Sequence, residues 1–372
     1  MGVLALLAGS GAWAVAPAAQ GTPSIESYWK LDELSGTAAM DSSGNGHGAT
    51  LMGGAAISTL IPPIPTNNQR SVALLNAVNN QHVNVPSNAA FDFTTGFTLA
   101  CWVRLTGTPD TQMGLLERWS SGTTANNGYL FRLGRIGSPA TAHHLKINVG
   151  NGTTPIEVAE YTAIPLNTWI HLATTWDGTW LKLYKNGAMV AQNNAFAGAV
   201  SATTVPLEIG QSGPHRLQGN IDEVYTFNTA LTTTQVGILV NGQPPPTNLQ
   251  VQPLVNALTV SWTAEPNAAS YNVFRSDGGG AFTLITNTTS TSYLDTGATY
   301  PGTYAYQVTA IGFMESAPLG PVSGTPFSPI PRTNDHEEGL FGDSCACGST
   351  IPLGPTPWAV LALLAAFRRR KR

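Results

Sequence analysis

The sequence predicts an all-β protein built from a larger β-sandwich followed by a smaller one. Short runs of alternating apolar, β-branched and aromatic residues recur along most of the chain, and clusters of Gly, Asn and Pro separate them. A run of three prolines, Pro244 to Pro246, then divides the chain in two. The length of 372 residues is enough for two or three domains.

The larger sandwich is expected over residues 24–243. Its clearest strands are predicted at 71–75, 82–85, 97–105, 129–133 and 144–149. Two glycine dipeptides predict tight hairpins, because they tolerate positive φ at the central turn positions. These are Asp177-Gly178, between 169–176 and 179–185, and Asn186-Gly187, before 188–192. Many short strands at regular spacing are typical of a sandwich or jelly roll.

One short helix is expected near the end of this sandwich. Thr232 and Gln235 have the spacing of a capping box, and Val236, Leu239 and Val240 supply an apolar face. Gly242 can end the helix.

Five motifs in this region carry a resemblance to a known family. In chain order they are Tyr28-Trp-Lys-Leu-Asp-Glu33, Asp41-Ser-Ser-Gly-Asn-Gly46, the 97–105 strand, Leu183-Tyr-Lys-Asn-Gly187 and Gly219-Asn-Ile-Asp-Glu-Val-Tyr225. This order resembles laminin-G-like domains, which are concanavalin A-like jelly rolls. The resemblance covers residues 24 to about 243. It implies two antiparallel sheets, a role in binding glycans or proteins and, in many members, a structural calcium ion.

The resemblance implies where calcium would bind. Asp41 and Asp222 are expected to meet at a site completed by Asn45 and backbone carbonyls, and Asp32 is a weaker candidate. Strand alternation places Ile221, Glu223, Tyr225 and Phe227 on one face and Asp222 on the other. The alternative is that Asp41 caps a turn and Asp222 accepts loop N–H groups.

Ligand contacts are predicted at aromatic and basic residues near loops. Trp119, Tyr129 and Arg132 lie in or beside the Gly/Asn-rich segment 118–135, and Trp180 follows the Asp177-Gly178 turn. The alternative is that these aromatic residues belong to the core.

The sequence argues against catalysis. Retaining glycosidases need two carboxylates about 5–5.5 Å apart. The concanavalin A-like glucanases carry Glu-x-Asp-x-Glu on one strand, but Asn220 and Val224 replace both glutamates here. Glu157 and Glu160 have the wrong spacing for one strand face, and the His143-His144 pair is interpreted as a solvated strand start. We therefore expect a protein that is not an enzyme.

Residues 247–325 predict the smaller sandwich. The segments 258–262, 271–275 and 304–310 alternate cleanly and resemble strands B, C and F of a fibronectin type III domain. The resemblance makes Trp262 the core tryptophan and Tyr304 the corner tyrosine. The chain contains no Arg-Gly-Asp tripeptide, and the simplest interpretation of this domain is a spacer. Residues 326–344 then predict a linking stalk.

Sorting signals are predicted at both chain ends. The run Val3 to Ala16 is apolar and small, and Ala16-Pro-Ala18 offers a cleavage site. Residues 1–20 are therefore predicted to be a signal peptide, although a basic n-region is missing. The segment 345–372 combines Cys345-Ala-Cys347, an apolar run and five terminal cations. It resembles the myxobacterial-type C-terminal sorting domain. That resemblance implies transient membrane insertion, removal by a sorting protease and attachment to the cell surface. The alternatives are an intact tail anchor and a Cys-x-Cys metal site.

Cysteine content and charge limit the function further. Of three cysteines, two belong to the tail, and Cys101 shares a strand face with Phe97, Leu99, Val103 and Leu105, which predicts a core position. Without the five terminal cations, the chain has 12 basic and 21 acidic residues, which gives a formal net charge near −9. This acidity argues against nucleic-acid binding.

The sequence therefore predicts an exported, cell-surface-anchored recognition protein whose larger sandwich binds an extracellular glycan or protein without catalysis. Two alternatives remain open. One is a structural surface or matrix protein without a discrete ligand, and the other is an unusual polysaccharide hydrolase.

Overall fold

A computed structural model describes residues 23–64, 68–75, 80–109, 111–121, 126–196 and 198–329. The predicted signal peptide, the sorting segment with Cys345 and Cys347, and most of the stalk lie outside these ranges. Among the described residues, no helix is long and apolar enough to span a membrane.

The first sheet of the larger sandwich, sheet A, has eight strands among the described residues. Its order is β14-β13-β12-β7-β18-β5-β4, and β1 pairs with β18 beside β5. The bounds are β1 Ile25–Trp29, β4 Ala56–Ser58, β5 Ser71–Leu74, β7 Phe97–Leu105, β12 Trp169–Trp176, β13 Leu181–Lys185, β14 Ala188–Asn193 and β18 Gly219–Phe227.

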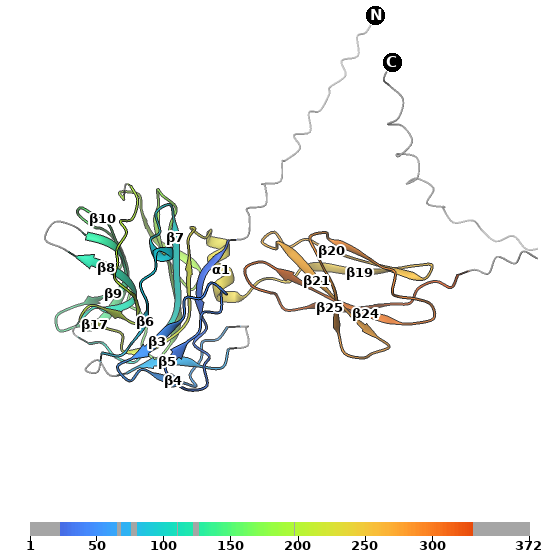
Figure 1. The fold of residues 1–372 in the computed structure, drawn as a ribbon, viewed down its shortest axis with the longest axis horizontal. Coiled ribbons are helices and arrows are strands. Elements are labelled where there is room, and N and C mark those ends of the chain that lie inside the picture. Colours follow the sequence, from blue (N-terminus) through green and yellow to red (C-terminus); the bar gives the residue numbers. More distant parts are fainter. Residues whose placement is uncertain are drawn as a thin grey trace, which may run out of the picture. The chain divides into compact units, whose positions relative to one another are not determined.

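The second sheet, sheet B, also has eight antiparallel strands in the described part of the chain. Its order is β11-β10-β9-β8-β15-β6-β3-β2. The bounds are β2 Ala38–Ala39, β3 Ala49–Met52, β6 His82–Val85, β8 Met113–Ser121, β9 Asn126–Ile136, β10 Ala142–Asn151, β11 Ile156–Glu160 and β15 Leu207–Ile209. A short hairpin, β16 Gln211–Ser212 and β17 His215–Arg216, follows β15, and a 3-10 turn covers Ala89–Phe91 (Figure 1).

Alternating side chains of both sheets fill the space between them. Phe131 and Leu133 of β9 and Ile147 and Val149 of β10 are completely buried in one apolar cluster with residues of sheet A. Cys101 lies in the same cluster with no exposed surface, which confirms its predicted core position, and burial raises the pKa of its thiol. The neighbours of these core residues, such as Arg132 and Lys146, therefore point to the other side of sheet B, called here the outer face of sheet B.

The outer face of sheet A is covered by helix α1, Thr233–Asn241 (Figure 1). Val236 and Leu239 of α1 form an apolar cluster with Ala100, Tyr225 and other residues of that face. The capping box between Thr232 and Gln235 is present, and Gly242 ends the helix as predicted. The two outer faces of the sandwich therefore differ, because α1 packs on sheet A only.

The smaller sandwich has its own core. Its sheets have the orders β19-β20-β23 and β22-β21-β24-β25. The bounds are β19 Thr247–Leu254, β20 Ala257–Thr263, β21 Ser270–Asp277, β22 Thr283–Thr288, β23 Ser292–Asp295, β24 Tyr304–Ile311 and β25 Leu319–Gly324. Trp262 lies in this core, and the Tyr304 hydroxyl donates to the Thr299 carbonyl at 3.1 Å. The all-β prediction, with a jelly roll and a smaller β-sandwich, is confirmed.

Three local predictions differ from the structure. The segment 118–135 consists mainly of β8 and β9. The Asp177 connection is a four-residue loop, because the Asp177 carboxylate accepts the N–H groups of Thr179 and Trp180 and β13 starts only at Leu181. His143 and His144 are buried on β10, with 0% and 6% exposure, instead of solvated.

Candidate functional site

A small cavity opens on the outer face of sheet B. Its volume is about 240 Å³, and it is lined by Glu117, Trp119, Val205, Pro206, Glu208 and Gly213. Glu117 and Trp119 alternate on β8, Glu208 lies on the neighbouring β15, and Gly213 is at the turn between β16 and β17. We call this cavity the Trp119 pocket.

The Trp119 indole is half-buried and lies against glycines of the neighbouring strands. Gly128 pairs with Trp119 and also with Gly150, so two residues without side chains lie beside the ring. A Cβ at Gly150 would come within 3.0 Å of the Trp119 Cη2 atom and 2.2 Å of the Asn126 carbonyl oxygen. The missing side chains let the ring lie close to the sheet with part of its surface open.

Two carboxylates meet in the same pocket. Glu117 and Glu208 are directly opposite residues of the antiparallel pair β8–β15. Directly opposite Cβ atoms are about 4.5–5.5 Å apart, so the two side chains are neighbours on one face. Glu117 is 9% exposed, and the Gln211 side-chain amide donates to Glu208 Oε2 at 3.2 Å.

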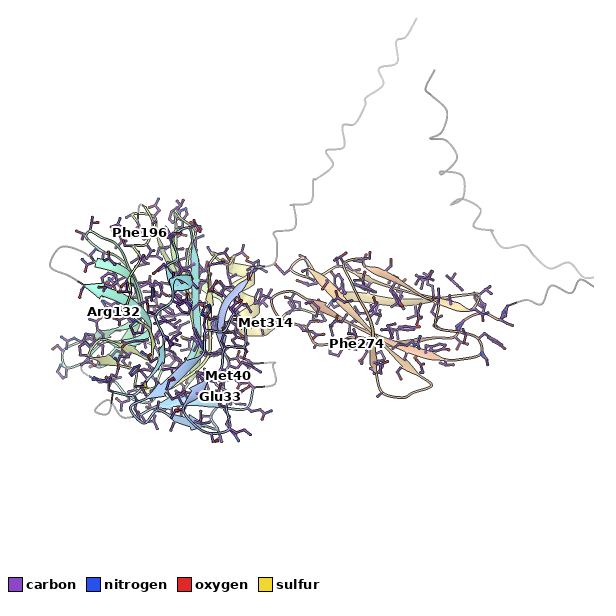
Figure 2. The ribbon with its side chains drawn as sticks, in the orientation of Figure 1. Glu33, Met40, Arg132, Phe196, Phe274 and Met314 are labelled. Atoms are coloured by element: carbon purple, nitrogen blue, oxygen red, sulfur yellow. The ribbon has the colours of Figure 1, made fainter. Side chains whose placement is uncertain are left out.

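A polar network continues across β9, β10 and β11. The Arg132 guanidinium donates to Asn148 Oδ1 at 3.1 Å, while Lys146 and Asn148 both donate to Glu157 Oε2, at 2.8 and 3.0 Å. Burial would raise the pKa of Glu157, but these hydrogen bonds outweigh it and lower that pKa. Burial lowers the pKa of Arg132, against the opposing effect of Glu117 and Glu157. Figure 2 labels Arg132 on the side of the jelly roll where β8, β9 and β10 run.

The wall of the pocket is held by a buried arginine. Arg118 is 1% exposed, and its guanidinium donates to Asp92 at 2.9 Å and to the carbonyls of Thr203 and Val205. Val205 itself lines the pocket. The ion pair therefore fixes the segment that closes one side of the cavity.

The predicted ligand residues separate into three locations. Trp119 and Arg132 both lie on the outer face of sheet B, on β8 and β9. Tyr129 is 1% exposed and packs against Phe93 and Phe97, so the structure places it in the core instead of at a ligand surface. Trp180 is half-buried in the loop between β12 and β13 of sheet A, away from the other two.

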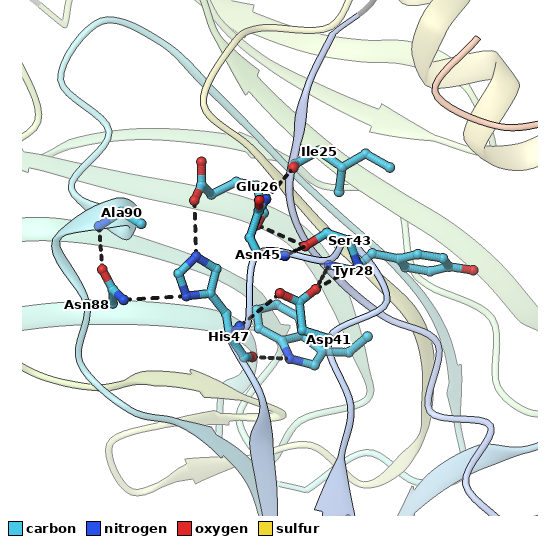
Figure 3. Close-up of polar contacts among 10 residues, drawn as sticks. Ile25, Glu26, Tyr28, Asp41, Ser43, Asn45, His47, Asn88 and Ala90 are labelled. Carbon is cyan, nitrogen blue, oxygen red and sulfur yellow. Dashed lines mark hydrogen bonds and ion pairs between the residues drawn. The ribbon is translucent and has the colours of Figure 1, made fainter. Parts of the chain in front are cut away.

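Asp41 organises the loop between β2 and β3 and joins it to β1 (Figure 3). Its Oδ1 accepts the N–H groups of Tyr28 and Ser43 at 3.0 and 2.9 Å, and its Oδ2 accepts that of His47 at 2.9 Å. Burial raises the pKa of Asp41, but these donors together lower it. The Asn45 side chain donates to the carbonyls of Ile25 and Glu26 at 3.0 and 2.9 Å.

Asp222 lies on the other side of β1. Asp41 bridges to Trp29 of β1, whose opposite neighbour is Val224 of β18, so the strand β1 separates Asp41 from β18. Asp222 Oδ2 accepts the Asn68 amide at 2.7 Å, and Asp222 Oδ1 is buried without a hydrogen-bond partner in the described structure. Burial raises the pKa of Asp222 to about 9.

The alternation predicted around Asp222 is wrong. A bulge shifts the register of β18 between Asp222 and Tyr225, and Glu223 has φ +49°. Glu223 is buried, and its Oε2 accepts the hydroxyls of Tyr28 and Tyr225 at 2.6 and 2.8 Å. Ile221 faces the sandwich core, whereas Tyr225 packs in the cluster beneath α1.

Calcium needs several oxygens directed at one point. Asp41 and Asn45 direct their polar atoms to the backbone of their own loop and of β1, and Asp222 is paired with Asn68 beyond β1. No group of three His, Cys, Asp or Glu side chains suited to a metal occurs within the described ranges. The three predicted ligands do not fit around a single ion in this arrangement, and calcium binding stays a prediction.

The sequence did not identify Glu117 and Glu208 as a pair. They lie far apart in the chain, and only the register of β8 against β15 makes them neighbours. The local sequence signal for this site was the pair of glycines beside Trp119, Gly128 and Gly150. Glycine inside a strand often marks the close approach of another group.

Comparison with known proteins agrees with this architecture. Residues 77–237 match the model of the concanavalin A-like lectin/glucanases superfamily. Mouse (Mus musculus) pappalysin-1 is 28% identical over 153 residues, which are 38% of this chain and 9% of pappalysin-1. The chain thus spans less than a tenth of that relative.

Similar solved structures include domain 4 of AbnA, a GH43 extracellular arabinanase from Geobacillus stearothermophilus, in complex with arabinotriose. It is 20% identical with a TM-score of 0.42, over 59% of this chain and 100% of that one. The binding domain of Paraclostridial Mosquitocidal Protein 1 is 13% identical with a TM-score of 0.45, over 84% of this chain and 69% of that one. The family match supports a concanavalin A-like jelly-roll domain at residues 77–237.

Proposed function

We propose that this protein recognises an extracellular glycan through the Trp119 pocket and does not modify it. The observation that carries the proposal is the partly open Trp119 indole beside two carboxylates in one cavity. Sugar sites commonly combine an aromatic face with a few convergent polar groups that accept hydroxyl hydrogens. The outer face of sheet B is also the side of the jelly roll on which α1 does not pack.

Export and anchoring complete the proposal. The apolar segment 1–20 supports secretion, and Cys345-Ala-Cys347 with the apolar, basic tail supports processing by a sorting protease after transient membrane insertion. In this proposal the smaller sandwich holds the recognition domain away from the surface. A protein ligand in place of a glycan is an outcome that the binding experiment distinguishes.

The test is binding of the full chain to a broad panel of polysaccharides, followed by the Trp119→Ala variant. We expect at least one glycan to bind and the variant to lose at least tenfold in affinity, about 1.4 kcal/mol. Trp180→Ala is the matched control, because Trp180 is also half-buried but lies in sheet A's β12–β13 loop. Loss of binding in Trp180→Ala with retention in Trp119→Ala would place the site elsewhere, and a folded chain that binds no glycan would favour a protein ligand or a structural role.

Hydrolysis is a second candidate because Glu117 and Glu208 are direct cross-strand neighbours. Retaining glycosidases require carboxyl groups about 5–5.5 Å apart, and the side chains of opposite residues, whose Cβ atoms are about 4.5–5.5 Å apart, can bring two carboxyl groups to such a separation. The measurement is release of reducing ends from any glycan that binds, compared with the Glu208→Gln variant. Release that disappears in Glu208→Gln would make the protein an enzyme, and its absence would support recognition alone.

A further inference from the structure

The charge of the Trp119 pocket restricts what can enter it. Of its six lining residues, two are ionisable, and both are acidic. Glu117 and Glu208 stand directly opposite each other, an arrangement in which like charges destabilise a sheet. A sugar hydroxyl can donate a hydrogen bond to a carboxylate, but it does not neutralise the repulsion between two of them.

Neighbouring groups offset the negative charges of Glu117 and Glu208 to different extents. Arg132 interacts electrostatically with Glu117 from the adjacent strand β9, and its own hydrogen bond goes to Asn148. Glu208 receives the neutral amide of Gln211, and it forms no ion pair with a cation among the described residues. A positive charge placed between the two carboxylates would therefore be stabilised chiefly by Glu208.

The indole points to an organic cation in preference to a metal ion. A cation over an aromatic face gains about 0.5–2 kcal/mol, and Trp119 lines the cavity beside both glutamates. A calcium ion would need six to eight oxygens, whereas the remaining lining residues are Val205, Pro206 and Gly213. A primary ammonium carries three N–H donors, which suit two carboxylates and one ring face.

We propose that the Trp119 pocket binds the free ammonium group of an amino sugar, so that the ligand is a polymer of unsubstituted amino sugars. This inference rests on the proposed function and names the ligand class of the same site. The cavity of about 240 Å³ is smaller than the 300–1,000 Å³ of drug-sized pockets. It therefore accommodates one sugar unit with its amino group, while the rest of the polymer lies outside.

The experiment compares two hexasaccharides that differ only at C2, where β-1,4-linked glucosamine carries a free amine and its fully N-acetylated form carries a neutral, bulkier acetamide. Binding of each to the full chain is measured by calorimetry at pH 6, where the amine is protonated. We expect the glucosamine oligomer to bind at least tenfold more tightly. Glu208→Gln, at a half-buried position, should remove this preference without changing the shape of the side chain.

Two further variants separate a specific pocket from general attraction to an acidic protein. Glu157→Gln removes the same charge from the same face outside the pocket, and it should leave the preference unchanged within twofold. Trp119→Ala should weaken binding of the glucosamine oligomer at least tenfold. Equal losses in Glu157→Gln and Glu208→Gln would overturn the inference, because nonspecific attraction would then explain the binding.

The outcomes also distinguish this inference from the proposed function. If the N-acetylated or a neutral glycan binds as well or better and binding still depends on Trp119, the amino-sugar inference fails and glycan recognition stands. If neither hexasaccharide nor any glycan of the panel binds the folded chain, both fail.

Discussion

The side-chain amide of Asn68 donates a 2.7 Å hydrogen bond to the carboxyl group of Asp222, which has no exposed surface. Burial is the main cause that raises the pKa of Asp222 to about 9, and the nearby charge of Glu223 adds to it. The pair therefore links the strand β18 to a loop on the outer face of sheet A through a carboxyl group that is protonated at neutral pH.

The pKa of Asp222 predicts a pH-dependent stability. Its folded-state value lies above the ordinary value of 3.8, so the contribution of this proton to stability is fully present below about pH 4 and is lost as pH rises from there through about 9. Each pH unit between these values lowers the free energy of unfolding by at most about 1.4 kcal/mol. We expect thermal melts between pH 5 and 9 to show this slope in the wild type and a flatter profile in Asp222→Asn. An unchanged slope in the variant would show that other groups cause it.

Replacing Tyr225 with Phe should destabilise the jelly roll. The Tyr225 hydroxyl donates at 2.8 Å to the buried Glu223 carboxylate, and hydrogen bonds to charged groups contribute about 1.5–3 kcal/mol. Urea denaturation should show a loss of this size. Tyr161→Phe is the control, since Tyr161 is 70% exposed, and it should change stability by less than about 0.5 kcal/mol. Similar losses in both variants would contradict the contribution assigned to the hydrogen bond between Tyr225 and Glu223.

Replacing Arg118 with Ala should cost about 3–5 kcal/mol, because it leaves Asp92 and two carbonyls without their buried cationic donor. The same variant should weaken glycan binding, since Arg118 holds the Val205 wall of the Trp119 pocket. Arg104→Ala removes only a 3.2 Å contact with Asn167 and serves as the control. Denaturation and the glycan panel measure the two effects, and unaltered stability in Arg118→Ala would be inconsistent with this account.

The contacts of Asp41 predict that replacing it destabilises the protein equally with and without calcium. Asp41→Ala removes the acceptor of three backbone N–H groups and should cost about 1–3 kcal/mol. Melting temperatures of the wild type and variant are compared in excess calcium and in chelator. We expect the same loss in both. A loss confined to the calcium condition would instead support the calcium site predicted at Asp41, Asn45 and Asp222.

Regular local patterns made much of the fold predictable. The bounds of β7 and β12 agree with the expected 97–105 and 169–176, because apolar alternation and turn residues mark both ends. The capping box of α1 was readable from Thr232 and Gln235. The bulge at Glu223 could not be predicted from the sequence. Alternation assumes a constant register, and one inserted residue moves every later side chain of the strand to the opposite face.

The proposed binding face was predictable only in part. Trp119 and Arg132 were found by residue type, whereas Tyr129, of equally suitable type, alternates into the core. A two-residue period decides which side of a strand a residue occupies, but it does not say which sheet face remains open. The pairing of Glu117 with Glu208 depends on how strands from distant parts of the chain align.

The Trp119 pocket, at about 240 Å³, has room for a single sugar-sized group. A contact of that size buries little surface and holds its ligand weakly when one copy meets one chain. Many copies on a single cell would meet a repeating polymer at many points, and linked contacts of this kind can strengthen attachment by about 10²–10⁴. Adhesion by such a protein would then depend on how densely it is displayed, and it would release a short fragment while holding a long chain.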